Sequence, residues 1–126
     1  MRFAMSRGRL HIDLRVFRQG RDIQVLCQGG AAHLGAVALA VPSTEGTGKS
    51  AEVQAQLLVL PGHREDAIAL GMARRMAAEL RCAVCVSAGI HYNDITREEI
   101  RQVEAMAQAL TERCLISLKK DASCSR

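Results

Sequence analysis

Hydrophobic and polar side chains alternate over residues 10–17, near the start of the chain. A period of two residues is typical of a β-strand that buries one face, and it places His11 on the solvent side. A turn sequence at residues 19–22 and a second apolar run at residues 23–27 follow this strand. The pattern therefore predicts a β-hairpin over residues 10–28.

Three further apolar runs, at residues 36–41, 55–60 and 82–88, have the length of strands. Residues 42–52 separate the first run from the second and are rich in Ser, Thr, Gly and Glu, which is typical of an exposed, mobile loop. We expect each of the three runs to form one strand of a sheet.

Two longer segments carry apolar residues at the spacing of an amphipathic helix. The first spans about residues 63–80. The second begins after Thr96, where Thr96 and Glu99 fit a capping box, in which each side chain accepts a hydrogen bond from the other residue's amide. Its apolar stripe consists of Ile100, Val103, Ala107, Leu110 and Cys114.

The predicted order β-β-β-β-α-β-α indicates an α/β fold with a single mixed sheet of about five strands and two main helices. The 126 residues suffice for one domain. We expect it to span residues 1–126, with a core at about 9–118, a flexible N-terminal arm and a frayed polar tail from Asp121. If the strands at 55–60 and 82–88 are parallel, their ends meet at one edge of the sheet.

Composition excludes several classes of function. The net charge is only +4, its basic residues are dispersed, and aromatic residues make up 2% of the chain, so a base-stacking nucleic-acid module is not expected. No apolar run approaches the roughly 20 residues that span a bilayer. The first ten residues lack a secretory pattern, so we expect a cytoplasmic protein with its five cysteines reduced.

Two local motifs are incomplete. Gly48-Lys49-Ser50 matches the end of a phosphate-binding P-loop, but Ser43 stands where the motif requires its first glycine. Cys82 and Cys85 have the spacing of a redox or zinc half-site, yet in a strand they would point to opposite faces. We therefore expect a solvated loop and two structural cysteines.

Three of the four histidines lie in glycine-bearing segments where apolar runs end, at residues 29–35, 61–66 and 89–93. Glycine lets the backbone approach a ligand closely, and imidazole donates, accepts, ligates metals or carries a proton. The three segments predict one site at a sheet edge. His33 joins it only if the strand at 23–27 is parallel to the strand at 82–88.

The first turn of the first helix admits two interpretations. His63 and Arg64 would offer an anion the helix amides and a guanidinium. Alternatively, the acidic residues Glu65 and Asp66 only complement the helix dipole. After the last strand, His91 and Asn93 would present polar groups, or would simply support a turn.

The chain resembles the prenylated-flavin chaperones, the LpdD-like small D subunits that accompany UbiD-like, gallate-type decarboxylases. The resemblance covers roughly residues 10–116. It rests on Gly29-Gly30 with His33-Leu34-Gly35, on His63-Arg64-Glu65-Asp66 before Met72-Ala73-Arg74-Arg75, and on Gly89-Ile90-His91-Tyr92-Asn93-Asp94-Ile95-Thr96. The last segment carries the most specific match.

What the resemblance implies is binding of prenylated flavin mononucleotide, with plain FMN as a weaker ligand, and its delivery to or maturation in a partner decarboxylase. The protein would be a carrier rather than the decarboxylase itself. The family is similar to proteasome-assembly chaperones, which tend to dimerise, and exposed apolar helix faces also suit a homodimer. The implied cofactor-binding residues are Gly30, His33, Gly35, His63, Arg64, Asp66, Gly89, Ile90, His91 and Asn93, with Asp66 the looser match.

Two other functions remain open at this point. One is a small metal-dependent hydrolase or lyase that uses the three histidines with Glu65 or Asp66, although no two of these histidines share a helix at ligand spacing. The other is a flavin-free assembly protein whose loops only stabilise the fold. No metal is expected under the flavin interpretation.

Overall fold

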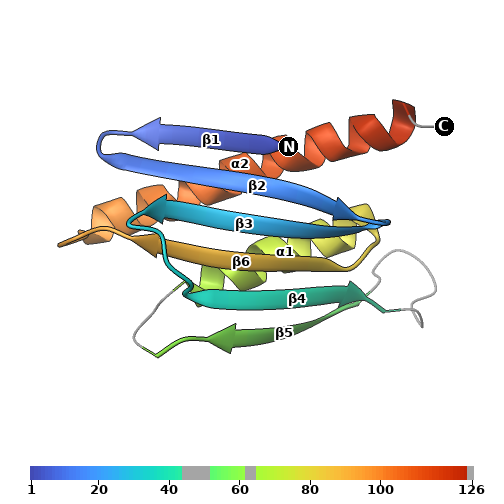
Figure 1. The fold of residues 1–126 in the computed structure, drawn as a ribbon, viewed down its shortest axis with the longest axis horizontal. Helices are drawn as coiled ribbons and strands as arrows, with labels where there is room; N and C mark the ends of the chain where they lie inside the picture. The colour runs from blue at the N-terminus through green and yellow to red at the C-terminus, as the bar shows by residue number, and fades with distance from the viewer. Residues whose placement is uncertain (44–51, 62–64, 125–126) are drawn as a thin grey trace.

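The computed structural model describes residues 1–43, 52–61 and 65–124, the last three of these by their backbone only. One mixed sheet of six strands has the order β1-β2-β3-β6-β4-β5, and two helices lie behind it (Figure 1). The elements are β1 (Arg2–Arg7), β2 (Leu10–Gln19), β3 (Asp22–Gly30), β4 (Ala36–Pro42), β5 (Val53–Val59), α1 (Asp66–Leu80), β6 (Val84–His91) and α2 (Arg97–Cys124).

The predicted fold class is confirmed, with one strand more than expected. The additional strand is β1, which pairs antiparallel with β2 where a flexible arm was expected. Phe3 and Met5 pack partly buried against the core, while Arg2 pairs with Asp13 at 2.6 Å on the other face. Three arginines in the first ten residues obscured this alternation in the sequence.

Strand directions bring the predicted segments to one edge. β3 runs parallel to β6, which is the condition under which His33 joins the predicted site. β4 lies between β6 and β5 and is antiparallel to both, so β5 and β6 run the same way without touching. The C-terminal ends of β3, β5 and β6 therefore share one sheet edge, and α1 begins there as well (Figure 1).

The core lies between the sheet and the helices. α1 covers β4, β5 and β6, and α2 contacts β1 and β2. Small side chains let α1 lie close to the sheet, since Ala36, Ala38 and Ala40 of β4 are buried, as are Ala69, Ala73 and Ala77 of α1. Close-packed interiors require such matching of volumes. Among the described residues, no helix lies on the other face of the sheet (Figure 1).

The predicted start of α2 is confirmed. The Glu99 amide donates to Thr96 Oγ1 at 3.0 Å, and the Thr96 amide donates to Glu99 Oε1 at 3.1 Å. Four residues of the predicted stripe are buried, but Ile100 is 38% exposed. The helix also continues to Cys124, where a frayed tail from Asp121 was expected.

Four cysteines have side chains that the structure describes, and these four, Cys27, Cys82, Cys85 and Cys114, are free thiols. Cys82 precedes β6 rather than lying in it, which corrects the predicted strand position. Burial raises the pKa of Cys27 to about 12 and that of Cys114 to about 11, so both side chains act as packed, unreactive groups. Within the described ranges, no helix is long and apolar enough to cross a membrane.

Candidate functional site

The candidate site forms where the β3–β4 connection crosses the end of β6. Because β3 and β4 pair with opposite sides of β6, residues 31–35 must pass over it. The Ala31 amide donates to His91 O and the Gly35 amide donates to Ala88 O, each at 3.0 Å. These bonds fix both ends of the crossing segment on β6.

Glycines make this crossing sterically feasible. A Cβ at Gly89 would overlap the backbone of His33, and one at Gly35 would overlap the Glu65 carboxylate. Gly30 has a φ of 61°, in the left-handed region, and a Cβ there would overlap the His91 carbonyl oxygen. Three predicted site glycines thus have a structural role, because they admit the close passage of one chain over another.

A buried carboxylate lies beneath the crossing. Glu65 is the N-cap residue of α1, yet its side chain makes no cap hydrogen bond and is 9% exposed. Its Oε1 accepts a hydrogen bond from the Ile90 amide at 3.3 Å and lies 3.2 Å from His33 Nε2. His33 Nε2 also lies 3.4 Å from Ile90 O.

These contacts give Ile90 of β6 the hydrogen-bond partners that β4 no longer supplies at this position. The last β4–β6 pair is Ala36 with Ala88, so Ile90 lies beyond the end of β4. Peptide groups alternate in direction along a strand, so those of Ile90 point to the same side as those of Ala88. Glu65 and His33 satisfy them there. Because both neighbours of His33 Nε2 are acceptors, this nitrogen carries the proton.

The polar part of the site faces solvent. His91 is exposed, and its Nε2 lies 3.2 Å from Asn93 Oδ1. The imidazole rings of His33 and His91 have centroids 6.1 Å apart and planes at 70°. One histidine is thus anchored on a buried carboxylate while the other is accessible to a ligand.

One oxygen of the buried carboxylate lacks a partner in the part of the chain that the structure describes. Glu65 Oε2 has no hydrogen-bond partner among the described residues, although it is inaccessible to solvent. A buried charged or polar atom without a partner is costly, so such an atom is a functional-site indicator. This position distinguishes Glu65 from an ordinary helix-capping residue.

The structure brings together most of the predicted site residues. Those that converge at the end of β6 are Gly30, His33, Gly35, Gly89, Ile90, His91 and Asn93. Asp66 is exposed in the first turn of α1, and the carboxylate at the site belongs to its neighbour Glu65. His63 and Arg64 lie outside the described residues, as does the P-loop-like segment 45–50.

Sequence reasoning missed the residues that hold the loop after β6. Tyr92 Oη accepts a hydrogen bond from the His11 amide at 2.7 Å and donates one to His11 O at 2.8 Å. Arg9 binds both carboxylate oxygens of Glu99 and donates to Asn93 O at 2.9 Å. The hydrogen bonds from Arg9 lower the pKa of Glu99 to about 2. The one signal in the sequence was the single tyrosine of the chain.

The described residues contain no group of three or more His, Cys, Asp or Glu side chains that could hold a metal ion. The metal-enzyme alternative therefore has no support from this part of the chain. His33 Nε2 and His91 Nε2 face Glu65 and Asn93 instead.

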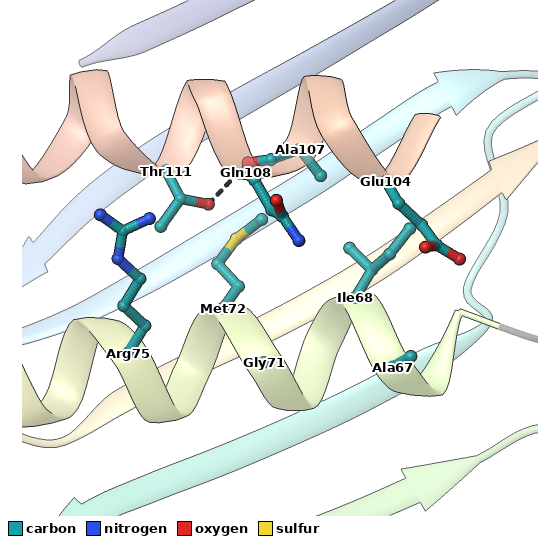
Figure 2. A pocket seen from close by; sticks show the side chains of 9 residues that line it. All are labelled: Ala67, Ile68, Gly71, Met72, Arg75, Glu104, Ala107, Gln108 and Thr111. Atoms are coloured by element: carbon teal, nitrogen blue, oxygen red, sulfur yellow. Dashed lines mark hydrogen bonds between the residues drawn. The ribbon is translucent and has the colours of Figure 1, made fainter. Parts of the chain in front are cut away.

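A groove of about 270 Å³ lies elsewhere, between α1 and α2 (Figure 2). Two of its polar side chains have partners: Thr111 Oγ1 donates to Ala107 O at 2.7 Å, and Arg75 pairs with Glu79 and Glu112. None of the predicted site residues lines it. We therefore assign the candidate site to the end of β6 and not to this groove.

Comparison with known proteins gives a family and a fold. A family model described as the prenylated flavin chaperone LpdD-like domain matches residues 6–119. Among solved structures, a chain from the crystal structure of a chaperone complex for yeast 20S proteasome assembly is similar, with a TM-score of 0.54. The 16% identity, over 94% of this chain and 96% of that one, shows a shared fold. No curated protein gives a significant match.

Proposed function

The chain belongs to the prenylated flavin chaperone LpdD-like family, and from this premise we propose that it binds prenylated flavin mononucleotide for a UbiD-like decarboxylase. It acts there as a chaperone or maturation factor in the cytoplasm, not as the decarboxylase. The observation that carries the proposal is the convergence of the glycine and histidine segments at the end of β6.

The residues at this edge fit a flavin. A flavin ring presents carbonyl acceptors and an N–H donor along one edge, so it needs polar partners beside a close backbone. His91 and Asn93 are exposed and supply such partners. The three glycines bring the backbone of two segments together without side chains between them.

The buried carboxylate has a positioning role in this proposal. Glu65 fixes His33 with its proton on Nε2, and so holds the His33 ring at 70° to the ring of His91. Glu65 Oε2 itself is shielded behind Gly35, so it acts through its neighbours. This is the arrangement by which a buried acid orients an imidazole.

His63 and Arg64 complete the proposal at the start of α1. They directly precede Glu65 in the sequence, and α1 runs for 15 residues from Asp66. Free amides at a helix N-terminus and a guanidinium suit the ribityl phosphate. Asp66, in the same turn, is kept as a weaker candidate because its side chain is exposed.

When bound, the prenylated flavin supplies the chemistry used by the decarboxylase, and this chain supplies binding, orientation and shielding. A carrier must also release its cargo. We therefore expect a dissociation constant near micromolar, about −8 kcal/mol, and weaker retention of plain FMN.

The test is an anaerobic titration with prenylated FMN and with FMN, followed by desalting and an absorbance spectrum. The wild-type protein should retain the prenylated form. His91→Ala should weaken its binding about tenfold, because one ligand hydrogen bond is lost. The matched control is His11→Ala, since the side chain of His11 is also exposed but bonds Ser6 of β1.

Equal retention by wild type and His91→Ala would remove the proposed site. If the wild-type protein retains neither flavin, the flavin-free assembly function replaces this proposal. Elemental analysis of the same sample addresses the third alternative, since stoichiometric zinc, iron or manganese would favour a metal-dependent enzyme.

A further inference from the structure

The groove between α1 and α2 is a second surface, separate from the candidate site. Its apolar lining comes from Ile68 and Met72 of α1 and Ala107 of α2, and the small residues Ala67 and Gly71 form its α1 side (Figure 2). The volume of about 270 Å³ lies below the roughly 300–1,000 Å³ of small-molecule pockets. The groove therefore suits one anchoring side chain of a protein partner better than a whole cofactor.

The described part of the chain gives no packing reason for a glycine at position 71. Gly71 is exposed in the interior of α1, where glycine is among the least favourable residues. A Cβ there would meet no described atom within 4 Å, whereas a Cβ at Gly35 or Gly89 would overlap a neighbouring segment. An exposed glycine that weakens its helix and is not needed for packing indicates close approach of a backbone from outside the chain.

The charge that the groove leaves unpaired is negative. At one end, Arg75 pairs with both Glu79 and Glu112. At the other end, near Ile68, Glu104 is exposed and has no ion pair with another described residue (Figure 2). The groove thus presents an apolar hollow beside a carboxylate. It complements a partner segment that carries a large apolar side chain next to a basic one.

The groove begins beside the candidate site. Ala67 and Ile68 lie in the first turn of α1, directly after Glu65 and Asp66. A partner bound along the groove would therefore lie within one helical turn of the buried carboxylate. A protein that receives a cofactor from the end of β6 has to dock close to that edge, and this groove is an apolar surface that starts there.

We propose that the groove binds a helix of the decarboxylase that receives the flavin, an inference that rests on the proposed function. The partner helix inserts one large apolar side chain between Ile68, Met72 and Ala107. Its backbone passes over Gly71, and a basic side chain lies beside Glu104. An amphipathic helix in an apolar groove is a recurrent mode of recognition. Helix axes pack about 8–10 Å apart, and small side chains at the contact allow the shorter distances.

Calorimetric titration of the chain with a UbiD-like decarboxylase purified without its cofactor tests the proposal. The wild-type chain should bind, and Gly71→Ala should weaken binding at least about tenfold, because the new methyl group overpacks the contact with the partner backbone. The fold should tolerate this change, since the added Cβ meets no described atom within 4 Å. Glu104→Lys should weaken binding by a similar factor, because it places a cation opposite the partner's basic side chain.

Two changes outside the groove are the matched controls. Ala78→Leu adds more volume than Gly71→Ala, at another exposed position of α1. Asp121→Lys reverses a charge that is 54% exposed near the C-terminal end of α2. Neither residue lines the groove, so both variants should bind the decarboxylase as the wild type does.

The outcomes separate this proposal from the proposed function, because the titration uses no flavin. A wild-type chain that does not bind the decarboxylase, or Gly71→Ala and Glu104→Lys variants that bind as tightly as the wild type, would overturn the docking site. Retention of prenylated FMN is measured separately, and Gly71→Ala should retain it as the wild type does. Failure of the wild type to retain flavin contradicts the proposed function instead. If light scattering shows that Gly71→Ala dissociates a dimer of the chain, a second copy fills the groove and the proposal is wrong.

Discussion

At the scale of residues, the motif glycines and Glu65 have roles in the structure that differ from those that the sequence suggested. The glycines of the motifs resemble ligand-binding residues in the sequence, and the structure shows that they are required first for a chain crossing. Glu65 resembles a helix-dipole partner, and the structure places it under His33 as a buried acceptor. Each role depends on residues distant in the sequence, so no local pattern reveals it.

Gly89→Ala is expected to destabilise the protein by about 2 kcal/mol or more, because the new methyl group would overlap the His33 backbone. Urea unfolding measures the free energy. Gly71→Ala, in α1, is the control: its Cβ would meet no atom within 4 Å, so it should stabilise by about 0.5–1 kcal/mol. Equal effects of the two changes would contradict the crossing geometry.

At the scale of elements, periodicity predicted most strands and both helices, and their ends were accurate where a local chemical signal existed. The Thr96–Glu99 capping box fixed the start of α2. The start of α1 had no such signal, since the side chain of its N-cap residue bonds β6 instead. β1 was missed because a charged edge strand shows little alternation.

Thr96→Ala should cost about 1 kcal/mol of stability, because it leaves the Glu99 amide without its side-chain acceptor. Thr96→Ser keeps the hydroxyl and should cost only a few tenths of that. Thermal or urea unfolding of the two variants separates loss of the cap from loss of the methyl group. A similar cost for both would show that the hydroxyl is not what stabilises the start of α2.

At the scale of the whole molecule, a long-range ion pair joins the β1–β2 turn to α2. Arg9 holds both oxygens of Glu99 across 90 residues of sequence and also binds the carbonyl of Asn93. The loop that carries His91 and Asn93 is therefore tied to the first hairpin. The same contacts give the protein a pH dependence that can be measured.

The pKa of Glu99 is lowered from 4.5 to about 2 in the folded protein, chiefly by the hydrogen bonds from Arg9. A lowered folded-state pKa means that its stabilisation is complete above pH 4.5 and is lost as the pH falls toward 2. Glu99→Gln should therefore reduce the pH dependence of the free energy of unfolding in this window. Glu79, whose pKa is also lowered, by Lys119 and Arg75, should preserve part of the slope.

Chemical unfolding at pH 7, 4.5 and 3 makes this comparison. Glu98→Gln is the control. Glu98 is 67% exposed, and its ion pair with Arg101, at 3.6 Å, lies on the surface of the same helix and is therefore weak. It should leave the slope unchanged. If Glu99→Gln leaves the pH dependence of the free energy of unfolding unchanged, the Arg9–Glu99 ion pair does not lower the pKa of Glu99 in the folded protein.

The sequence by itself determined the α/β class, the two helices, five of the six strands and the three glycine-histidine segments, because hydrophobic periodicity and capping are local properties of the chain. Only the tertiary structure decided the strand order, and with it the site. By placing β6 between β3 and β4, it forced the crossing over Gly89, brought Glu65 to His33 and left β4 uncovered on one face. These are contacts between distant segments, set by how the elements pack and not by any segment alone.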